Sequence, residues 1–263
     1  MVFRNKMPNL HRLDLTGTTI EANPYEFYTG CYTEENRLPE YAFHEQKKLL
    51  GIKLPKTITY IGSHAFEGCP NLRDVQLHEG ITTIGEYAFN KCTALPYVEI
   101  PAGVAVIDDR AFQQCSSLEE VRLNEGLLRM GVEVFSLAKH LKNINLPLSL
   151  QEIGRNCFYS CSLESVTVPE NVRTLPDDVF ASNRNLQTVT LPSRLRSIGN
   201  NAFEGCVSLQ EIRIPPMVET IGNNAFSSCD ELSDVYVYLA NAKDLKINQN
   251  TFGRWTTALL HVP

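Results

Sequence analysis

The sequence predicts a right-handed α/β solenoid of about eleven turns, with a parallel β-sheet along its concave face and short helices or irregular turns along its convex face. Two observations predict this fold. Phenylalanine recurs at an almost constant interval of 22 or 23 residues, and each interval repeats the same order of apolar positions. One such unit cannot bury its own apolar side chains, so neighbouring units must stack.

The phenylalanine interval is regular over most of the chain. The series consists of Phe43, Phe66, Phe89, Phe112, Phe135, Phe158, Phe180, Phe203 and Phe226. Its one step of 22 coincides with a missing residue in Cys161-Ser162-Leu163, where other units have Cys-x-x-Leu. Phe252 continues the series after a step of 26.

The apolar positions between the phenylalanines define a leucine-rich repeat. Each unit reads L-x-x-V-x-L-x-x-x-I-x-x-I-G-x-x-A-F-x-x-C-x-x. The clearest copy consists of Leu72, Val75, Leu77, Ile81, Ile84, Gly85, Ala88, Phe89 and Cys92. The predicted fold is therefore a leucine-rich repeat solenoid.

A short strand is predicted in every unit. Val75 and Leu77 alternate with Asp74, Gln76 and His78, a period of two that is typical of a half-buried strand. The pairs that mark strand centres are Leu13/Leu15, Ile52/Leu54, Val75/Leu77, Val98/Ile100, Val121/Leu123, Ile144/Leu146, Val166/Val168, Val189/Leu191, Ile212/Ile214, Val235/Val237 and Leu260/Val262. At about 4.8 Å between strands, these pairs predict a sheet about 48 Å long.

A helical turn is predicted on the opposite side of each unit. Ser63, Phe66, Cys69 and Leu72 are spaced by three residues and follow Gly62 directly. This spacing, with a serine at its start, indicates a short capped turn of helix.

Four copies of the repeat read IGSHAFEGC, IGEYAFNKC, IGNNAFEGC and IGNNAFSSC, each followed by LxxVxL or a close variant. They resemble the BspA-like leucine-rich repeat family, and the resemblance covers nearly the whole chain. The segment from Leu13 to Phe43 also looks like the opening of such repeat regions in gut bacteria of the Bacteroides type. The resemblance implies a surface-exposed or secreted protein of a host-associated bacterium, in which the repeats serve adhesion or protein binding.

A single repeat domain is expected over residues 1–263, with an insert at about 16–37 between the first and second repeats. The insert carries Tyr25, Phe27, Tyr28 and Tyr32, which either pack down as an N-terminal cap or present a contact surface. The chain begins inside a repeat and ends directly after a strand, whereas solenoids normally carry polar caps. We therefore expect a segment of a longer protein.

The cysteines are expected to be buried free thiols. Six of the eight occupy one repeat position: Cys69, Cys92, Cys115, Cys161, Cys206 and Cys229. Other units have Ala138, Asn183 and Trp255 there, and a disulfide framework would not lose single members so freely. Cys157 takes a core position, and Cys31, in the insert, is the cysteine expected to be most exposed.

Neither catalysis nor cofactor binding is expected. Cys157 and Cys161 are four residues apart, but no second pair of ligands is spaced to close a tetrahedral metal site. The six histidines are scattered, and the sequence has no phosphate loop, nucleophile elbow or HExxH motif. The adjacent pairs Glu34-Glu35 and Asp108-Asp109 are interpreted as turn or surface charge.

Charge and hydropathy exclude two classes of partner. Lys and Arg total 24 against 30 Asp and Glu, for a net charge of −6, and no basic block occurs. This balance argues against nucleic acid. No apolar run reaches the roughly 18–20 residues that span a bilayer, and no signal peptide precedes the repeats, so this segment is not expected to insert into a membrane.

Function is expected on the concave sheet face or in the insert. The outward positions of the predicted strands are small, polar and uncharged in the middle of the chain, and charged or aromatic on either side. The candidate ligand-binding residues are Tyr97, Glu99, Glu120 and Arg122 on one side, and Glu211, Arg213, Asp234 and Tyr236 on the other. Tyr and Arg are enriched at binding hot spots. The alternative is a solvated sheet whose charges pair across strands.

The sequence thus predicts a non-catalytic protein-binding or adhesion module of a cell-surface or secreted protein. Its expected partner is a protein, such as a host matrix or surface protein, or a glycan. A structural spacer in a multidomain surface protein is one alternative. A recognition domain for an enzyme encoded outside this segment is another.

Overall fold

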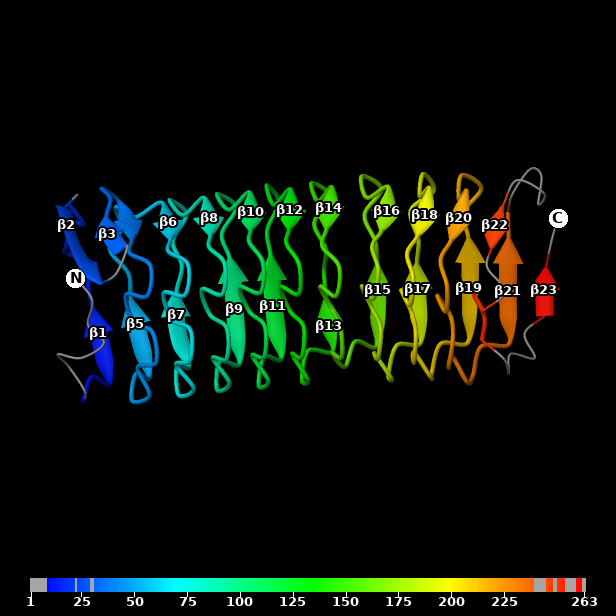
Figure 1. The fold of residues 1–263 in the computed structure, drawn as a ribbon, viewed down its shortest axis with the longest axis horizontal. Helices are drawn as coiled ribbons and strands as arrows, with labels where there is room; N and C mark the ends of the chain where they lie inside the picture. Colours follow the sequence, from blue (N-terminus) through cyan, green and yellow to red (C-terminus); the bar gives the residue numbers. More distant parts are fainter. Residues whose placement is uncertain are drawn as a thin grey trace.

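The fold is an extended stack of turns in which two rows of parallel strands run side by side (Figure 1). It is seen in a computed structural model that describes residues 9–21, 23–28, 31–238, 245–247, 250–253 and 259–261. The first turns lie at one end of the stack and the last turns at the other, so residues far apart in sequence meet only across neighbouring turns (Figure 1).

The first row, which we call the long-strand ladder, is the sheet that the alternating pattern predicts. Its strands are β1 (Arg12–Asp14), β5 (Gly51–Lys53), β7 (Asp74–Gln76), β9 (Tyr97–Ile100), β11 (Glu120–Leu123), β13 (Asn143–Ile144), β15 (Ser165–Thr167), β17 (Thr188–Thr190), β19 (Glu211–Ile214), β21 (Asp234–Val237) and β23 (Leu259–His261). Where neighbouring strands pair, equivalent residues of successive turns lie in register, as in Val98 opposite Val121. The pairing is interrupted between β7 and β9, between β13 and β15, and between β17 and β19. In β9 and β11 exposed and buried residues alternate, which confirms the predicted period of two.

A second row of two-residue strands was not predicted. It consists of β4 (Arg37–Leu38), β6 (Tyr60–Ile61), β8 (Thr83–Ile84), β10 (Val106–Ile107), β12 (Arg129–Met130), β14 (Glu152–Ile153), β16 (Thr174–Leu175), β18 (Ser197–Ile198), β20 (Thr220–Ile221) and β22 (Lys246–Ile247). Each strand except β22 holds one inward apolar residue, such as Ile84, and two residues are too few to show an alternating pattern in the sequence.

The predicted helical turns were wrong, since no helix occurs among the described residues. In the segment after Gly62, alternate N–H groups bond within the turn and to the next turn. Glu67 N–H donates to the His64 carbonyl at 3.2 Å, whereas Phe66 N–H donates to the Ala88 carbonyl of the next turn at 2.7 Å. His64 and Gly68 have positive φ angles of 57° and 68°, which interrupt a right-handed helix. A chain of tight turns therefore produces the spacing of three.

The regular part of the solenoid has about nine turns, fewer than the eleven predicted. The prediction counted the strand pairs at both ends as complete turns. Strands β1 and β23 do pair with β5 and β21. However, the chain from β1 to β5 passes through the insert, and much of the chain from β21 to β23 lies outside the described residues.

The phenylalanines form one continuous column inside the stack. Each ring from Phe43 to Phe252 stacks on the next, with centroids 5.0–5.8 Å apart and ring planes within 18° of parallel. The nine rings from Phe43 to Phe226 are fully buried. Burial of one such ring stabilises the fold by about 1.5–3 kcal/mol, so the column is a main source of stability.

The cysteines form a second column, as predicted. Each repeat thiol is buried and donates to the carbonyl of the phenylalanine one turn earlier, at 3.0–3.3 Å. Seven cysteines, Cys157 included, are free and buried. The side chain of Cys31, and Trp255, lie outside the described residues.

The 22-residue repeat marks a break in both rows of strands, which we call the seam. Neither β13 and β15 nor β14 and β16 pair, although all other strands of the second row are continuous on either side. Pro176 contributes to the break, because it occupies the repeat position at which Gly154 and Gly199 donate to the preceding turn and it has no N–H. The phenylalanine column crosses the seam unbroken, with Phe158 and Phe180 5.5 Å apart.

Much of the predicted insert is a hairpin. Strands β2 (Asn23–Tyr28) and β3 (Cys31–Thr33) pair antiparallel. A small apolar hollow of about 180 Å³ next to the insert is lined mainly by Leu15, Ile20, Leu38 and Ala42. The side chains of Tyr25, Phe27, Tyr28 and Tyr32 lie outside the described residues, so the choice between a cap and a contact surface stays a prediction.

Candidate binding face

All eight predicted face residues project from the long-strand ladder, in two groups. The N-terminal cluster comprises Tyr97 and Glu99 on β9 with Glu120 and Arg122 on β11. The C-terminal cluster comprises Glu211 and Arg213 on β19 with Asp234 and Tyr236 on β21. Within each group the residues lie on adjacent paired strands, whereas β13, β15 and β17 separate the two groups. The prediction of two flanks of one sheet therefore corresponds to two separate clusters.

The N-terminal cluster is loosely tied together. The Tyr97 hydroxyl donates to Glu99 at 3.1 Å, and the Arg122 guanidinium lies 3.5 Å from the same carboxylate. The hydrogen bond from Tyr97 lowers the pKa of Glu99, and partial burial raises the pKa of Tyr97. Within the described residues the Glu120 carboxylate has no hydrogen bond or ion pair. This cluster leaves side-chain groups free for a ligand.

The C-terminal cluster is closely packed around Tyr236. The Arg213 guanidinium lies 4.5 Å from the centre of the Tyr236 ring, and the His261 ring stacks on the same tyrosine at 4.5 Å. Because β21 lies between β19 and β23, the two partners cover opposite faces of the ring. Both faces of Tyr236 are therefore occupied.

Hydrogen bonds hold the partners of Tyr236 in place. Arg213 donates to Glu211 at 3.0 Å and to the Tyr238 hydroxyl at 2.8 Å, and these bonds raise its pKa. Asp234 lies 2.8 Å from His261 Nε2, and hydrogen bonds from Ser233 and then His261 lower the pKa of Asp234. The cluster is therefore ordered without a ligand.

Sequence reasoning missed two members of this cluster. His261 counted only as one of six scattered histidines, and Tyr238 was not considered. The signal for His261 was its position, since it lies in register with Arg213 and Tyr236. Tyr238 follows β21 directly and is 46% exposed, so no periodic pattern marks it.

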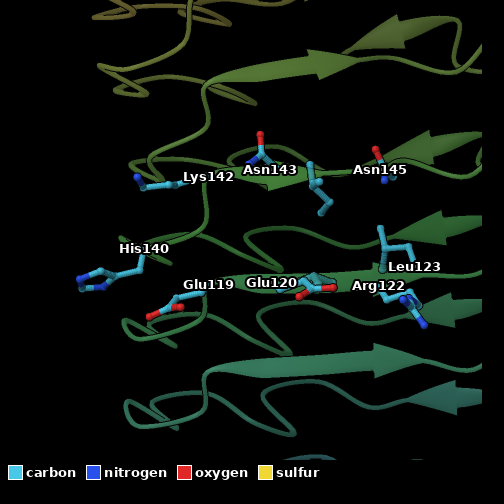
Figure 2. A pocket seen from close by; sticks show the side chains of 10 residues that line it. Glu119, Glu120, Arg122, Leu123, His140, Lys142, Asn143 and Asn145 are labelled. Carbon is cyan, nitrogen blue, oxygen red and sulfur yellow. The ribbon is translucent and has the colours of Figure 1, made fainter.

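A hollow of about 810 Å³ lies beside the N-terminal cluster, over β11 and β13. Figure 2 shows Glu120 and Arg122 on one strand, Asn143 on the next, and Asn145 directly after that strand. Glu119, His140 and Lys142 lie where these strands begin (Figure 2). Towards the C-terminus, the face continues with Ser165, Thr167, Thr188 and Thr190, which are exposed.

The buried cysteines lie in surroundings that suppress the reactivity of their thiols. Burial raises the pKa of Cys69, Cys115, Cys161 and Cys229 to about 12, so these thiols are protonated at neutral pH. No group of three His, Cys, Asp or Glu side chains in the described part of the chain is arranged to hold a metal ion. A search of the same residues for a membrane-spanning helix finds none.

Comparison with protein families identifies the repeat. The pattern of BspA type leucine-rich repeat regions matches residues 36–163 and 151–261, in six copies. The chain belongs to this family. No curated protein matches the sequence.

Solved structures of leucine-rich repeat proteins are similar to this chain. A leucine-rich repeat protein of T. pallidum is 26% identical, over 81% of this chain and 87% of that one, with a TM-score of 0.60. A leucine-rich cell surface protein of Faecalibacterium prausnitzii is 20% identical, over 97% of this chain and 88% of that one, with a TM-score of 0.41. The pneumococcal vaccine antigen PcpA is 18% identical, over 99% of this chain and 85% of that one, with a TM-score of 0.49.

Packing between turns explains why some positions of the BspA-type repeat are nearly the same in every turn and others differ. The phenylalanine, cysteine and inward strand positions are nearly constant because each packs against its equivalent one turn away. The outward positions of the long-strand ladder have no such constraint.

Proposed function

We propose that this BspA-type chain is a non-catalytic binding module of a cell-surface or secreted bacterial protein, and that it acts in adhesion. Its expected partner is a host matrix or surface protein, bound through the C-terminal cluster. Surface localisation and adhesion follow from the resemblance to BspA-like surface proteins. A repeat whose recurring phenylalanine and cysteine side chains are buried in the core supports a non-catalytic role.

One observation carries the choice of the C-terminal cluster: Tyr236 is held between Arg213 and His261 on an exposed sheet face. Tyr and Arg are the residues most enriched at protein-binding hot spots. Side chains that are ordered before binding lose little conformational entropy when a partner docks. A preorganised Arg–Tyr pair therefore supports protein binding better than freely moving surface charges would.

Surface plasmon resonance against immobilised extracellular matrix proteins and mucin tests the proposal. We expect saturable binding of the wild-type chain, and loss of about thirtyfold or more in affinity for Arg213→Ala, the size of effect that defines a hot spot. Arg196→Ala is the matched control, since Arg196 is also exposed and paired to a glutamate, Glu219, but on the second row of strands. Its affinity should be unchanged.

Two outcomes would contradict the proposal. Equal effects of Arg213→Ala and Arg196→Ala, in chains whose circular dichroism is native, would place the contact elsewhere, with the aromatic insert as the next candidate. Binding to none of the immobilised proteins would favour the structural spacer, whose exposed strands tolerate substitution.

A further inference from the structure

We propose that the hollow over β11 and β13 is a binding site for a neutral oligosaccharide, separate from the protein contact of the C-terminal cluster. The hollow has a volume of about 810 Å³, within the range of small-molecule sites. It covers two strands and about four residues along each, which at about 3.3 Å per residue and 4.8 Å between strands accommodates two or three linked pyranose rings.

Four polar side chains in the hollow have unused hydrogen-bonding groups. Among the described residues, the carboxylates of Glu119 and Glu120 and the amides of Asn143 and Asn145 have no hydrogen-bond partner, and all four side chains are exposed. His140 Nδ1 lies 2.5 Å from the Ser116 carbonyl, so this nitrogen carries the proton and Nε2 is left as an acceptor. Acceptors and donors are thus interleaved, as sugar hydroxyls, which both donate and accept, require.

The charges of the hollow select against anionic ligands. Its two cations are each engaged outside the hollow, since Arg122 faces Glu99 at 3.5 Å and Lys142 faces Glu164 at 3.4 Å. The carboxylates of Glu119 and Glu120 have no such counterion. The remaining negative charge disfavours sulfated or sialylated glycans and nucleic acid, whereas it accepts hydrogen bonds from neutral hydroxyl groups.

Tyr97 supplies an apolar surface at the edge of the hollow. It is 39% exposed and directly opposite Glu120 across the paired strands β9 and β11. In contrast to Tyr236, it has no ring-stacking partner within the described part of the chain. An open aromatic face beside carboxylate and amide groups can pack against the C–H face of a pyranose ring while the polar groups bind its hydroxyls.

A protein partner fits the hollow less well. The cores of protein interfaces are enriched in aromatic residues and arginine and are depleted of Glu and Lys. Beyond the seam, the same face continues with the exposed hydroxyls of Ser165, Thr167, Thr188 and Thr190. A longer saccharide that crosses the strands would therefore meet one pair of hydrogen-bonding side chains per turn, about 4.8 Å apart, which is close to the length of one sugar unit.

Isothermal titration with neutral linear hexasaccharides of glucose, mannose, xylose and N-acetylglucosamine tests the proposal, with a sulfated hexasaccharide and a Lys/Arg-rich peptide as further probes. We expect saturable binding of at least one neutral saccharide. The double variant Asn143→Ala/Asn145→Ala should weaken the affinity for this saccharide about tenfold or more, since each substitution removes an amide that hydrogen-bonds to it. Tyr97→Phe should bind like the wild-type chain, whereas Tyr97→Ala should not.

The controls separate this site from the protein contact. Thr188→Ala/Thr190→Ala removes exposed polar groups from the same face outside the hollow. It should change the affinity for the corresponding neutral trisaccharide, which is short enough to lie within the hollow, less than twofold. Arg213→Ala should leave saccharide binding intact while it weakens protein binding. The proposal is overturned if no neutral saccharide binds, if only the sulfated saccharide or the basic peptide binds, or if the Asn143/Asn145 variant binds like the wild-type chain.

Discussion

Asn183 replaces the repeat cysteine and compensates for the missing residue in the preceding turn. In regular repeats such as Cys92-Thr93-Ala94-Leu95, the leucine N–H donates to the cysteine carbonyl, at 3.1 Å for Leu95. The shortened Cys161-Ser162-Leu163 cannot form this turn. Instead, Leu163 N–H donates to Asn183 Oδ1 at 3.1 Å, while Asn183 Nδ2 donates to the carbonyls of Phe158 and Phe180.

Asn183→Ala should therefore destabilise the fold by about 1–3 kcal/mol, because it leaves the buried N–H of Leu163 without a partner. Cys115→Ala is the control. Ala138 already occupies the same repeat position, and the Phe89 carbonyl that Cys115 contacts also accepts from a backbone N–H. Urea denaturation measures both. Equal destabilisation by the two substitutions would contradict the compensating role of Asn183.

The buried thiols should be unreactive in the folded chain. Burial raises the pKa of Cys115 and Cys161 to about 12, so at pH 8 the reactive thiolate is a negligible fraction and the sulfur is inaccessible. We expect none of the seven described cysteines to react with Ellman's reagent at pH 8, and all of them to react in guanidinium chloride. The eighth cysteine, Cys31, accounts for at most one reacting thiol. Titration of more than one thiol in the native chain would therefore contradict the burial of the other seven.

At the level of elements, successive turns approach each other closely at Gly154, which follows the short strand β14. Gly154 N–H donates to the Met130 carbonyl at 2.9 Å, and a Cβ atom added to Gly154 would overlap the backbone of Gly131. The backbone of Gly154 is thus packed directly on that of the preceding turn, which leaves no room for a side chain at Gly154.

Gly154→Ala should destabilise the fold by about 3 kcal/mol or more, because the backbone of the neighbouring turn has to move. Gly17→Ala is a matched control, since an added Cβ at Gly17 meets no atom within 4 Å. It should change stability by less than about 0.5 kcal/mol. Thermal unfolding followed by circular dichroism distinguishes the two, and similar melting temperatures would show that the turns separate more easily than their packing indicates.

Some elements could be predicted from the sequence and others could not. The long strands were predictable because Val98 and Ile100 alternate with exposed residues over four positions. The second row was not, since two residues cannot display a period. The predicted helices failed because the tight turns and a helix place apolar residues at the same spacing of three, and only the positive φ angles at residues such as His64 and Lys91 distinguish them.

The binding face shows the same difference. The outward residues of β9, β11, β19 and β21 were predictable from alternation alone. Their grouping into one open and one closed cluster was not, because it depends on contacts such as His261 on Tyr236, between residues 25 positions apart.

For the molecule as a whole, acid should be destabilising. Hydrogen bonds from the N–H groups of Leu148 and Ser193 in neighbouring turns lower the pKa of Glu125 and Glu170, respectively, below the ordinary 4.5. A folded-state pKa below the unfolded one means that the ionised carboxylate stabilises the fold, and that this contribution is lost as the pH falls through the lowered value. Stability should therefore decrease below about pH 4.5.

Urea midpoints measured between about pH 5 and pH 3 check this dependence. Glu125→Gln/Glu170→Gln should reduce it, whereas Glu119→Gln, which removes a carboxylate without a hydrogen bond among the described residues, should not. An identical acid response in all three chains would show that the bonds between turns contribute nothing to the pH dependence.

The seam gives the stack an uneven resistance to bending. At the seam, both rows of strands lack the hydrogen bonds that pair neighbouring strands. Phe158 and Phe180 stay stacked there, and the Phe158 N–H still donates to the Val179 carbonyl of the next turn at 3.0 Å. A force that spreads the strands apart therefore meets its weakest point between β13 and β15. The molecule should bend there, with β13 and β15 moving apart while the aromatic column stays stacked and acts as the hinge.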